Sequence, residues 1–163
     1  MSKKIANIIS SLILIVLIAA VAVFVAPKVV GVTPMVVLSG SMEPTYPVGS
    51  LIFVEKSEAK DLQVGDKVTF HLGNTDTVVT HRVVTNDSEK QEIITKGDAN
   101  ENNDGNPVSY ASVIGKANDF AIPMLGYIGV FMNSTGGYIV MGCLILALIL
   151  ISFIGGNETK RKE

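Results

Sequence analysis

Hydrophobic residues are concentrated near the two ends of the chain, whereas hydrophobic and polar residues alternate in short runs between them. Residues 5–26 are almost entirely apolar, and no polar residue interrupts the run from residue 12 to residue 26. Residues 136–154 form a second run rich in Leu, Ile and Val. Because about 20 apolar residues cross the hydrocarbon core of a bilayer, the pattern predicts two transmembrane helices.

A cleaved secretory signal peptide is the alternative interpretation of the first run. Lys3 and Lys4 precede it, and small residues occur at Ala20, Ala22 and Ala26, a combination that is typical of signal peptides. The hydrophobic part of a signal peptide is usually shorter, however, and a second hydrophobic segment follows later in this chain. An uncleaved anchor is therefore favoured.

The stretch from residue 30 to residue 119 has a composition typical of β-structure. Val, Ile, Thr and Phe recur in short runs separated by Gly, Asn and Asp, and no long helical period occurs. Residues 36–38 form a short apolar strand that leads into a Ser39-Gly40-Ser41 turn. Further strands are expected at residues 50–55, 67–72, 77–84, 92–96 and 112–117. The predicted fold class is mainly β, a small antiparallel sheet or barrel-like domain between two transmembrane helices.

These segments divide the chain into five parts. Residues 120–135 are apolar but broken by Pro123, Gly126 and Gly129, which favours a segment at the membrane surface over a third crossing. The predicted parts are an N-terminal transmembrane anchor at 1–29, a β-rich domain at 30–119, a membrane-interface segment at 120–135, a C-terminal transmembrane helix at 136–156 and a basic tail at 157–163.

Charge predicts the orientation of the chain and excludes one class of partner. Basic residues lie at both ends, Lys3 and Lys4 at the first and Lys160, Arg161 and Lys162 at the second. Because cytoplasmic flanks of membrane spans are enriched in Lys and Arg, both termini are predicted to be cytoplasmic and the β-rich domain extracytoplasmic, in a two-span protein of the cell membrane. The formal net charge of -2 offers no basic surface for nucleic acid.

The β-rich region contains both histidines of the chain, His71 and His81. In a strand over residues 77–84, alternation puts His81 on one face with Val79 and Val83, so His81 is expected to be partly buried. Histidine takes up and releases a proton near neutral pH, which makes His81 the best available general base. The alternative is a structural histidine that bonds a backbone carbonyl. His71 has no companion motif and is interpreted as a surface residue.

Ser41 is the candidate nucleophile. A serine hydroxyl is a weak nucleophile unless a base accepts its proton and a third group orients that base. His81 supplies the base, and Asp98 and Asp104, in one Asn-rich loop, are the two candidates for the orienting carboxylate. The Ser41 backbone N–H and the Ser39 hydroxyl are candidate donors to an oxyanion.

Each of these residues also has a purely structural interpretation. Ser39 and Ser41 flank Gly40 in what is otherwise an ordinary Ser-Gly turn, and Asp98 and Asp104 are otherwise turn-forming residues or oxygen ligands of a weak cation site. The loop does not match the spacing of an EF-hand. No metal site is therefore expected.

Four short motifs resemble those of a known family, in the same order and with similar spacing. The motifs are Ser39-Gly40-Ser41-Met42-Glu43-Pro44-Thr45, Gly65-Asp66-Lys67-Val68, Thr80-His81-Arg82-Val83 and Thr95-Lys96-Gly97-Asp98-Ala99-Asn100. Over residues 35–117 the chain resembles the type I signal peptidases. His81 precedes Arg82 at the place where the usual bacterial members carry a lysine. In this respect the chain is similar to the endoplasmic-reticulum and archaeal type, which includes the W-type enzyme of Gram-positive bacteria.

The resemblance implies a role for each candidate residue. Ser41 matches the serine that attacks the peptide bond after a signal sequence, and His81 matches its general base. Asp104 is favoured as the partner of His81, with Asp98 as a supporting residue. Ser39 matches the oxyanion-hole serine of the family, and no metal or organic cofactor is implied.

The implied activity is that of a membrane-bound serine endopeptidase that removes N-terminal signal peptides from secreted preproteins. Its partners would be signal-peptide-bearing preproteins and the lipid bilayer, and accessory subunits are a further class of partner that the sequence does not name. The resemblance also implies small side chains one and three residues before the cut. Residues 36–38 are candidates for the walls of the pockets that hold them.

Two other functions compete with this one. A Ser-Lys hydrolase would use Lys67 or Lys96 as the base in place of His81. A non-catalytic, membrane-anchored β-domain would bind or assemble extracytoplasmic proteins without cutting them. The order of the four motifs favours a peptidase over the non-catalytic domain, and the Ser-Lys hydrolase remains the strongest rival among enzymes.

Overall fold

The computed structural model of the chain describes residues 3–157. The predicted basic residues Lys160, Arg161 and Lys162 lie outside the described residues. The chain divides into two compact units, a β unit of residues 27–129 and a helical unit that combines the regions before residue 27 and after residue 129.

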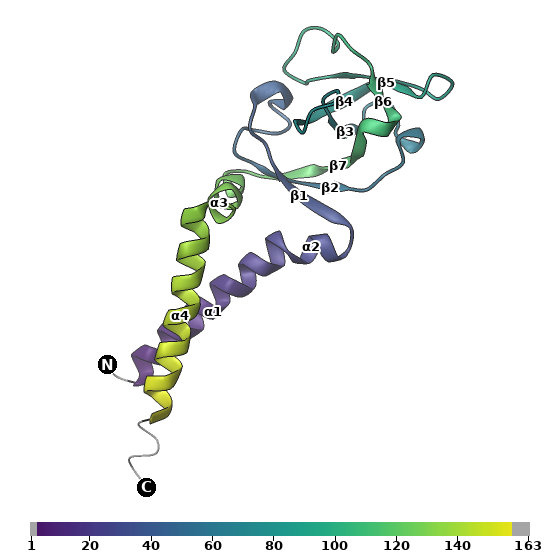
Figure 1. The fold of residues 1–163 in the computed structure, drawn as a ribbon. Coiled ribbons are helices and arrows are strands. Elements are labelled where there is room, and N and C mark those ends of the chain that lie inside the picture. The colour runs from purple at the N-terminus through teal and green to yellow at the C-terminus, as the bar shows by residue number, and fades with distance from the viewer. Residues whose placement is uncertain (1–2, 158–163) are drawn as a thin grey trace. The chain divides into compact units, whose positions relative to one another are not determined.

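The β unit is built on one antiparallel sheet of seven strands (Figure 1). Its strands are β1 (Val32–Val36), β2 (Leu51–Glu55), β3 (Lys67–His71), β4 (Val78–Asp87), β5 (Glu92–Lys96), β6 (Val108–Ser109) and β7 (Val113–Ile122). Their order in the sheet is β1-β2-β7-β3-β4-β5-β6, and each neighbouring pair is antiparallel. The predicted mainly β, antiparallel fold is confirmed.

The predicted strands agree best where apolar runs are compact. The strand at 92–96 matches β5, and those at 50–55 and 67–72 match β2 and β3 to within one residue. The short strand predicted at 36–38 is wrong in its bounds, because β1 ends at Val36. Val37 instead exchanges backbone hydrogen bonds with Gly49 and Ser50 across a turn. The two-residue strand β6 was not among the predicted strands.

Strand β7 runs through the predicted domain boundary at residue 119, to Ile122. The polar pair Asn118 and Asp119 suggests a strand end in sequence, but the Asn118 backbone carbonyl and the Asp119 carboxylate have partners in the fold. The buried Tyr46 hydroxyl donates a hydrogen bond to the Asn118 carbonyl, and Lys67 pairs with Asp119. A side chain from the loop before β2 and one from the neighbouring strand β3 therefore bind the polar centre of β7.

Two clusters of buried side chains hold the β unit together. One consists of Ala59, Leu62, Val68, Phe70, Val83, Ile93 and Val108. The other consists of Met42, Tyr46, Ile52, Val54 and Ala117. Full burial of one such aliphatic or aromatic side chain stabilises a fold by about 1.5–3 kcal/mol. The second cluster includes Met42, so packing anchors the segment that carries Ser41.

The helical unit contains α1 (Lys3–Phe24) and α4 (Thr135–Asn157), which contact each other. Helix α1 is long and apolar enough to cross a bilayer, and none of its apolar window is buried. Helix α4 passes the same test only when it is joined with α3 (Leu125–Met132) across a sharp bend. Within residues 3–157 one candidate span is therefore present, or two if the bent pair forms one span, so the prediction of two transmembrane helices is not confirmed. The short helix α2 (Ala26–Val29) follows α1.

Candidate active site

Ser41 lies in a single 3-10 turn, Gly40–Met42, directly after an extended residue, Ser39. Met42 on this turn is 2% exposed, and its carbonyl accepts a hydrogen bond from the Tyr46 backbone N–H. Packing of Met42 into the core thus fixes the turn and leaves the Ser41 side chain partly exposed.

A second loop holds the backbone of Ser41. The Ala99 backbone N–H donates a hydrogen bond of 2.9 Å to the Ser41 carbonyl oxygen. A Cβ atom on Gly97 would lie 2.6 Å from that same oxygen, a distance that two nonbonded atoms do not tolerate. A residue without a side chain is therefore required at position 97 for the loop to approach the candidate nucleophile.

His81 lies on β4 and places its ring beside the Ser41 hydroxyl. The distance from His81 Nε2 to Ser41 Oγ is 3.1 Å. His81 is 9% exposed, and its ring stands edge-on to Phe70, with 6.3 Å between ring centroids. The predicted alternation is confirmed, since His81 and Val83 are both buried on one face of β4.

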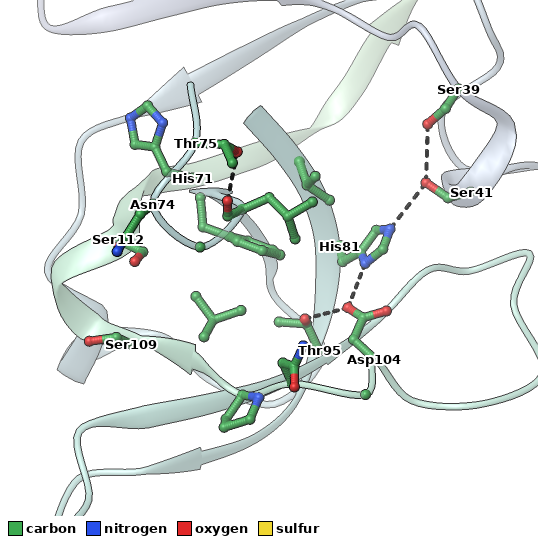
Figure 2. A pocket seen from close by; sticks show the side chains of 18 residues that line it. Ser39, Ser41, His71, Asn74, Thr75, His81, Thr95, Asp104, Ser109 and Ser112 are labelled. Carbon is green, nitrogen blue, oxygen red and sulfur yellow. Dashed lines mark hydrogen bonds and ion pairs between the residues drawn. The ribbon is translucent and has the colours of Figure 1, made fainter. Parts of the chain in front are cut away.

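Asp104 contacts the other ring nitrogen of His81. Its Oδ2 lies 2.6 Å from His81 Nδ1 and also accepts a hydrogen bond of 2.5 Å from the Thr95 hydroxyl. The Asp104 backbone N–H donates to the Thr95 carbonyl at 2.8 Å, which ties the loop to β5. Figure 2 shows the connected series Ser39, Ser41, His81, Asp104 and Thr95. A proton held on Nδ1 by Asp104 leaves Nε2 free to accept the Ser41 proton.

Asp98, the other candidate carboxylate, pairs with Arg82 instead of His81. Arg82 Nε donates to Asp98 Oδ1 at 2.7 Å and Arg82 Nη2 donates to Asp98 Oδ2 at 2.6 Å, a bidentate pair. The Thr45 hydroxyl donates to Asp98 at 2.5 Å, and Arg82 also donates to the Gly65 carbonyl at 2.7 Å. Asp98 therefore links three of the four motifs without touching the candidate base.

Hydrogen bonds from Arg82 are the main cause that holds the pKa of Asp98 below its ordinary value, against an opposing effect of burial. The same hydrogen bonds raise the pKa of Arg82. The Asp98 pKa is lower in the folded protein than in the unfolded chain. At pH values above the pKa of an unfolded aspartate, about 3.9, the Asp98–Arg82 pair therefore makes its full contribution to the stability of the fold. This contribution is lost as the pH falls below that value and through the lower folded one.

We therefore expect Asp98→Asn to lower the thermal unfolding midpoint of the detergent-solubilised chain at pH 7 and to have a smaller effect at pH 3. The reason is that pH 3 lies below the pKa of an unfolded aspartate, so the unfolded wild-type chain gains a proton there and part of the stabilisation by the pair is already lost. Calorimetry at both pH values measures the difference between the two proteins. Asp61→Asn, at an exposed aspartate, is the matched control. An Asp98→Asn difference that stays constant between pH 7 and pH 3 would contradict this account.

Ser39 lies next to the candidate nucleophile, with 3.4 Å between the two hydroxyl oxygens. Within residues 3–157, the hydrogen-bond partners of the Ser41 hydroxyl are Ser39 and His81. Lys67, a candidate base of a Ser-Lys enzyme, is 7% exposed and pairs with Asp119. Lys96 lies on β5 and is not a partner of the Ser41 hydroxyl either.

Sequence reasoning missed one member of the hydrogen-bonded series, Thr95. Its side chain is fully buried and donates to Asp104. Thr95 belongs to the fourth motif, and its place on β5, beside β4, was available from the strand pattern. Among the described residues, no group of three or more His, Cys, Asp or Glu side chains could hold a metal ion.

Two cavities in the β unit adjoin Ser41. One has a volume of about 570 Å³ and is lined by the segment 35–39 and by residues 76–80 at the start of β4. The other has a volume of about 660 Å³ and is lined by His81, Asp104, the β3–β4 turn and the region 105–112 (Figure 2). Both lie in the range of roughly 300–1,000 Å³ that is typical of ligand pockets.

Comparison with known proteins decides the family. A sequence model of one family, described as signal peptidase, peptidase S26, matches residues 8–101. The chain belongs to this family. It is therefore a peptide hydrolase of the signal peptidase class, and the predicted resemblance is confirmed.

Relatives from bacteria and yeasts support the same conclusion. Signal peptidase I W of Bacillus subtilis is 42% identical over 100 residues, 60% of this chain and 52% of the relative. The match thus spans about half the length of that bacterial relative. The signal peptidase complex catalytic subunit SEC11 of Lachancea thermotolerans is 35% identical over 139 residues, 76% of this chain and 78% of the relative. SEC11 of Saccharomyces cerevisiae is 33% identical over 132 residues, 71% of this chain and 76% of the relative.

Proposed function

We propose that this signal peptidase removes N-terminal signal peptides from secreted preproteins, with Ser41 as nucleophile, His81 as general base and Asp104 as the carboxylate that orients His81. The observation that carries the proposal is the unbroken hydrogen-bonded series from Ser41 Oγ to His81 Nε2, at 3.1 Å, and from His81 Nδ1 to Asp104 Oδ2, at 2.6 Å. These distances are within reach for proton transfer and for fixing one tautomer of the ring.

Acylation begins when Ser41 Oγ attacks the carbonyl carbon of the scissile peptide and its proton passes to His81 Nε2. The resulting imidazolium is stabilised by Asp104, which accepts from Nδ1 and is itself held by Thr95. His81 Nε2 then gives the proton to the departing amide nitrogen, and the carbon–nitrogen bond breaks. The mature protein leaves with a free amine, and the signal peptide remains as an ester of Ser41.

Deacylation uses the same groups in the reverse direction. His81 Nε2 takes a proton from water, the hydroxide oxygen attacks the ester carbonyl, and the proton passes to Ser41 Oγ as the signal peptide leaves as a carboxylic acid, which then loses its proton to solvent. In both steps the carbonyl oxygen becomes an oxyanion. The Ser41 backbone N–H and the Ser39 hydroxyl, 3.4 Å from Ser41 Oγ, are the proposed donors to it.

The cavity between residues 35–39 and residues 76–80 suits the part of the substrate before the cut. Its walls include the aliphatic side chains of Val36, Val37, Leu38 and Val78. Extended peptides bind by placing alternate side chains into pockets, so apolar walls of this size accept small apolar side chains one and three residues before the cut. The signal peptide itself, which lies in the bilayer, would be confined with the enzyme to two dimensions.

The membrane arrangement is part of the proposal. Helix α1 is the candidate first span, and α3 with α4 is the candidate second span. We propose the five-part organisation at 1–29, 30–119, 120–135, 136–156 and 157–163, with cytoplasmic termini and an extracytoplasmic peptidase domain. The proposed partners are preproteins and the lipid bilayer, and nucleic acid is not among them. The SEC11 relatives are named catalytic subunits of a complex, which makes accessory subunits a further class of partner.

Cleavage of a preprotein by the Asp104→Asn variant tests the proposed arrangement. We expect kcat to fall by about 10³–10⁴-fold, because an amide at position 104 no longer fixes the His81 tautomer or stabilises the imidazolium. Release of the mature protein by the full chain in detergent is followed by gel densitometry. Asp98→Asn is the matched control and should retain far more activity, since Asp98 pairs with Arg82. Equal losses in the two variants would refute the role of Asp104, and an inactive wild-type chain would refute the function.

A further inference from the structure

The larger cavity beside Ser41 has no role in the proposed reaction so far. It shares Ser39, Ser41 and Val79 with the smaller cavity, but His81 and Asp104 line the larger one alone. We propose that this cavity is the subsite for the first residues after the scissile bond, the new N-terminus of the mature protein. The inference rests on the proposed function of Ser41 and His81.

The direction of proton transfer assigns the two cavities to the two sides of the cut. His81 Nε2 must reach the departing nitrogen to protonate it, so that nitrogen lies about 3 Å from the ring. The chain that continues from this nitrogen therefore starts at His81. Since His81 lines the larger cavity and not the smaller one, the departing segment enters the larger cavity.

The lining of the larger cavity combines apolar side chains, such as Leu72 and Pro107, with uncharged polar ones. Figure 2 shows Asn74, Ser109 and Ser112 on the side of the cavity that faces Ser41, His81 and Asp104. Within the part of the chain that the structure describes, the Asn74 amide and the Ser112 hydroxyl have no hydrogen-bond partner in the protein. They are free to bond the backbone N–H and C=O groups of an extended peptide.

The charged groups of the cavity restrict the side chains that it accepts. Asp104 is occupied by His81 and Thr95, and His71 is the other titratable side chain in the lining. No lysine, arginine or glutamate of residues 3–157 contributes to the lining. The subsite therefore suits a peptide with uncharged side chains, apolar or polar, just after the cut, and Ser112 lies on its lining.

Filling the cavity from its far wall tests the subsite. Ser112→Phe adds a ring to that wall, away from Ser41 and His81. The substrates share one acyl part: a peptide with three leucines after the cut, a peptide with three glycines, and a methyl ester whose leaving group is methanol. We expect Ser112→Phe to lower kcat/KM about tenfold or more for the leucine peptide, and by less than about twofold for the glycine peptide and the ester. Ser88→Phe, at an exposed serine outside the cavity, is the matched control.

The outcomes separate this inference from the proposed function. One outcome is that the wild type cleaves all substrates and Ser112→Phe lowers kcat/KM equally for both peptides and the ester. That outcome would overturn the subsite and leave the proposed function intact. Failure of the wild type to cleave any of them would overturn both. Asn74→Trp fills the cavity from the exposed β3–β4 turn and gives the same test if Ser112→Phe does not fold. The same preference for glycine over leucine after the cut would support the subsite.

Discussion

Replacing His81 with alanine is expected to lower kcat/KM for preprotein cleavage by at least about 10⁴-fold, because Ser41 then has no base within hydrogen-bond distance. His81 is the side chain that contacts both Ser41 and Asp104. Binding of the residues before the cut should change little, since the apolar cavity lined by residues 35–39 and 76–80 does not include His81. Steady-state kinetics should therefore show a loss in kcat with a nearly unchanged KM.

The matched variant is Lys67→Met, which removes the ammonium group but keeps an unbranched apolar stem. Lys67 pairs with Asp119, whose side chain is 93% exposed, and ion pairs with a solvated partner contribute little to stability. Lys67→Met should therefore retain activity within about tenfold of wild type. The reverse pattern, an active His81→Ala and an inactive Lys67→Met, would show that the enzyme is a Ser-Lys hydrolase.

The sequence predicted the fold where local pattern is decisive. Compact runs of β-branched and aromatic residues located β2, β3 and β5 closely. The strand predicted at residues 112–117 ends too early, since β7 continues to Ile122. The partners of Asn118 and Asp119 are Tyr46 and Lys67, which are distant in sequence. Such contacts exist only once the sheet has formed, and no local pattern predicts them.

The candidate site shows the same limit. Residue chemistry alone singled out Ser41 and His81, and the resemblance favoured Asp104 over Asp98 as the partner of His81. The geometry that separates the two aspartates depends on their neighbours: Thr95 holds Asp104 beside the ring, and Arg82 with Thr45 holds Asp98 away from it. Both aspartates lie in one loop of similar composition, so spacing could not assign them from first principles.

Ser41→Ala is the second variant with a very large expected effect. Without the hydroxyl no acyl-enzyme can form, and kcat for preprotein cleavage should fall by about 10⁴–10⁶-fold relative to wild type. The fold should be preserved, because the Ser41 side chain is partly exposed and the turn is anchored by Met42 and by the Ala99 N–H. An unchanged thermal unfolding midpoint would confirm that the loss is chemical and not structural.

The most direct test of the whole account is mass spectrometry of one preprotein after incubation with the purified full chain in detergent, with Ser41→Ala beside it. Wild type should yield two products that sum to the preprotein plus one water, with the cut after a small residue, while Ser41→Ala leaves the preprotein intact. An identical mature N-terminus produced by Ser41→Ala would contradict the assignment of Ser41 as the nucleophile. An intact preprotein with both proteins would instead favour a membrane-anchored domain that binds preproteins without cutting them.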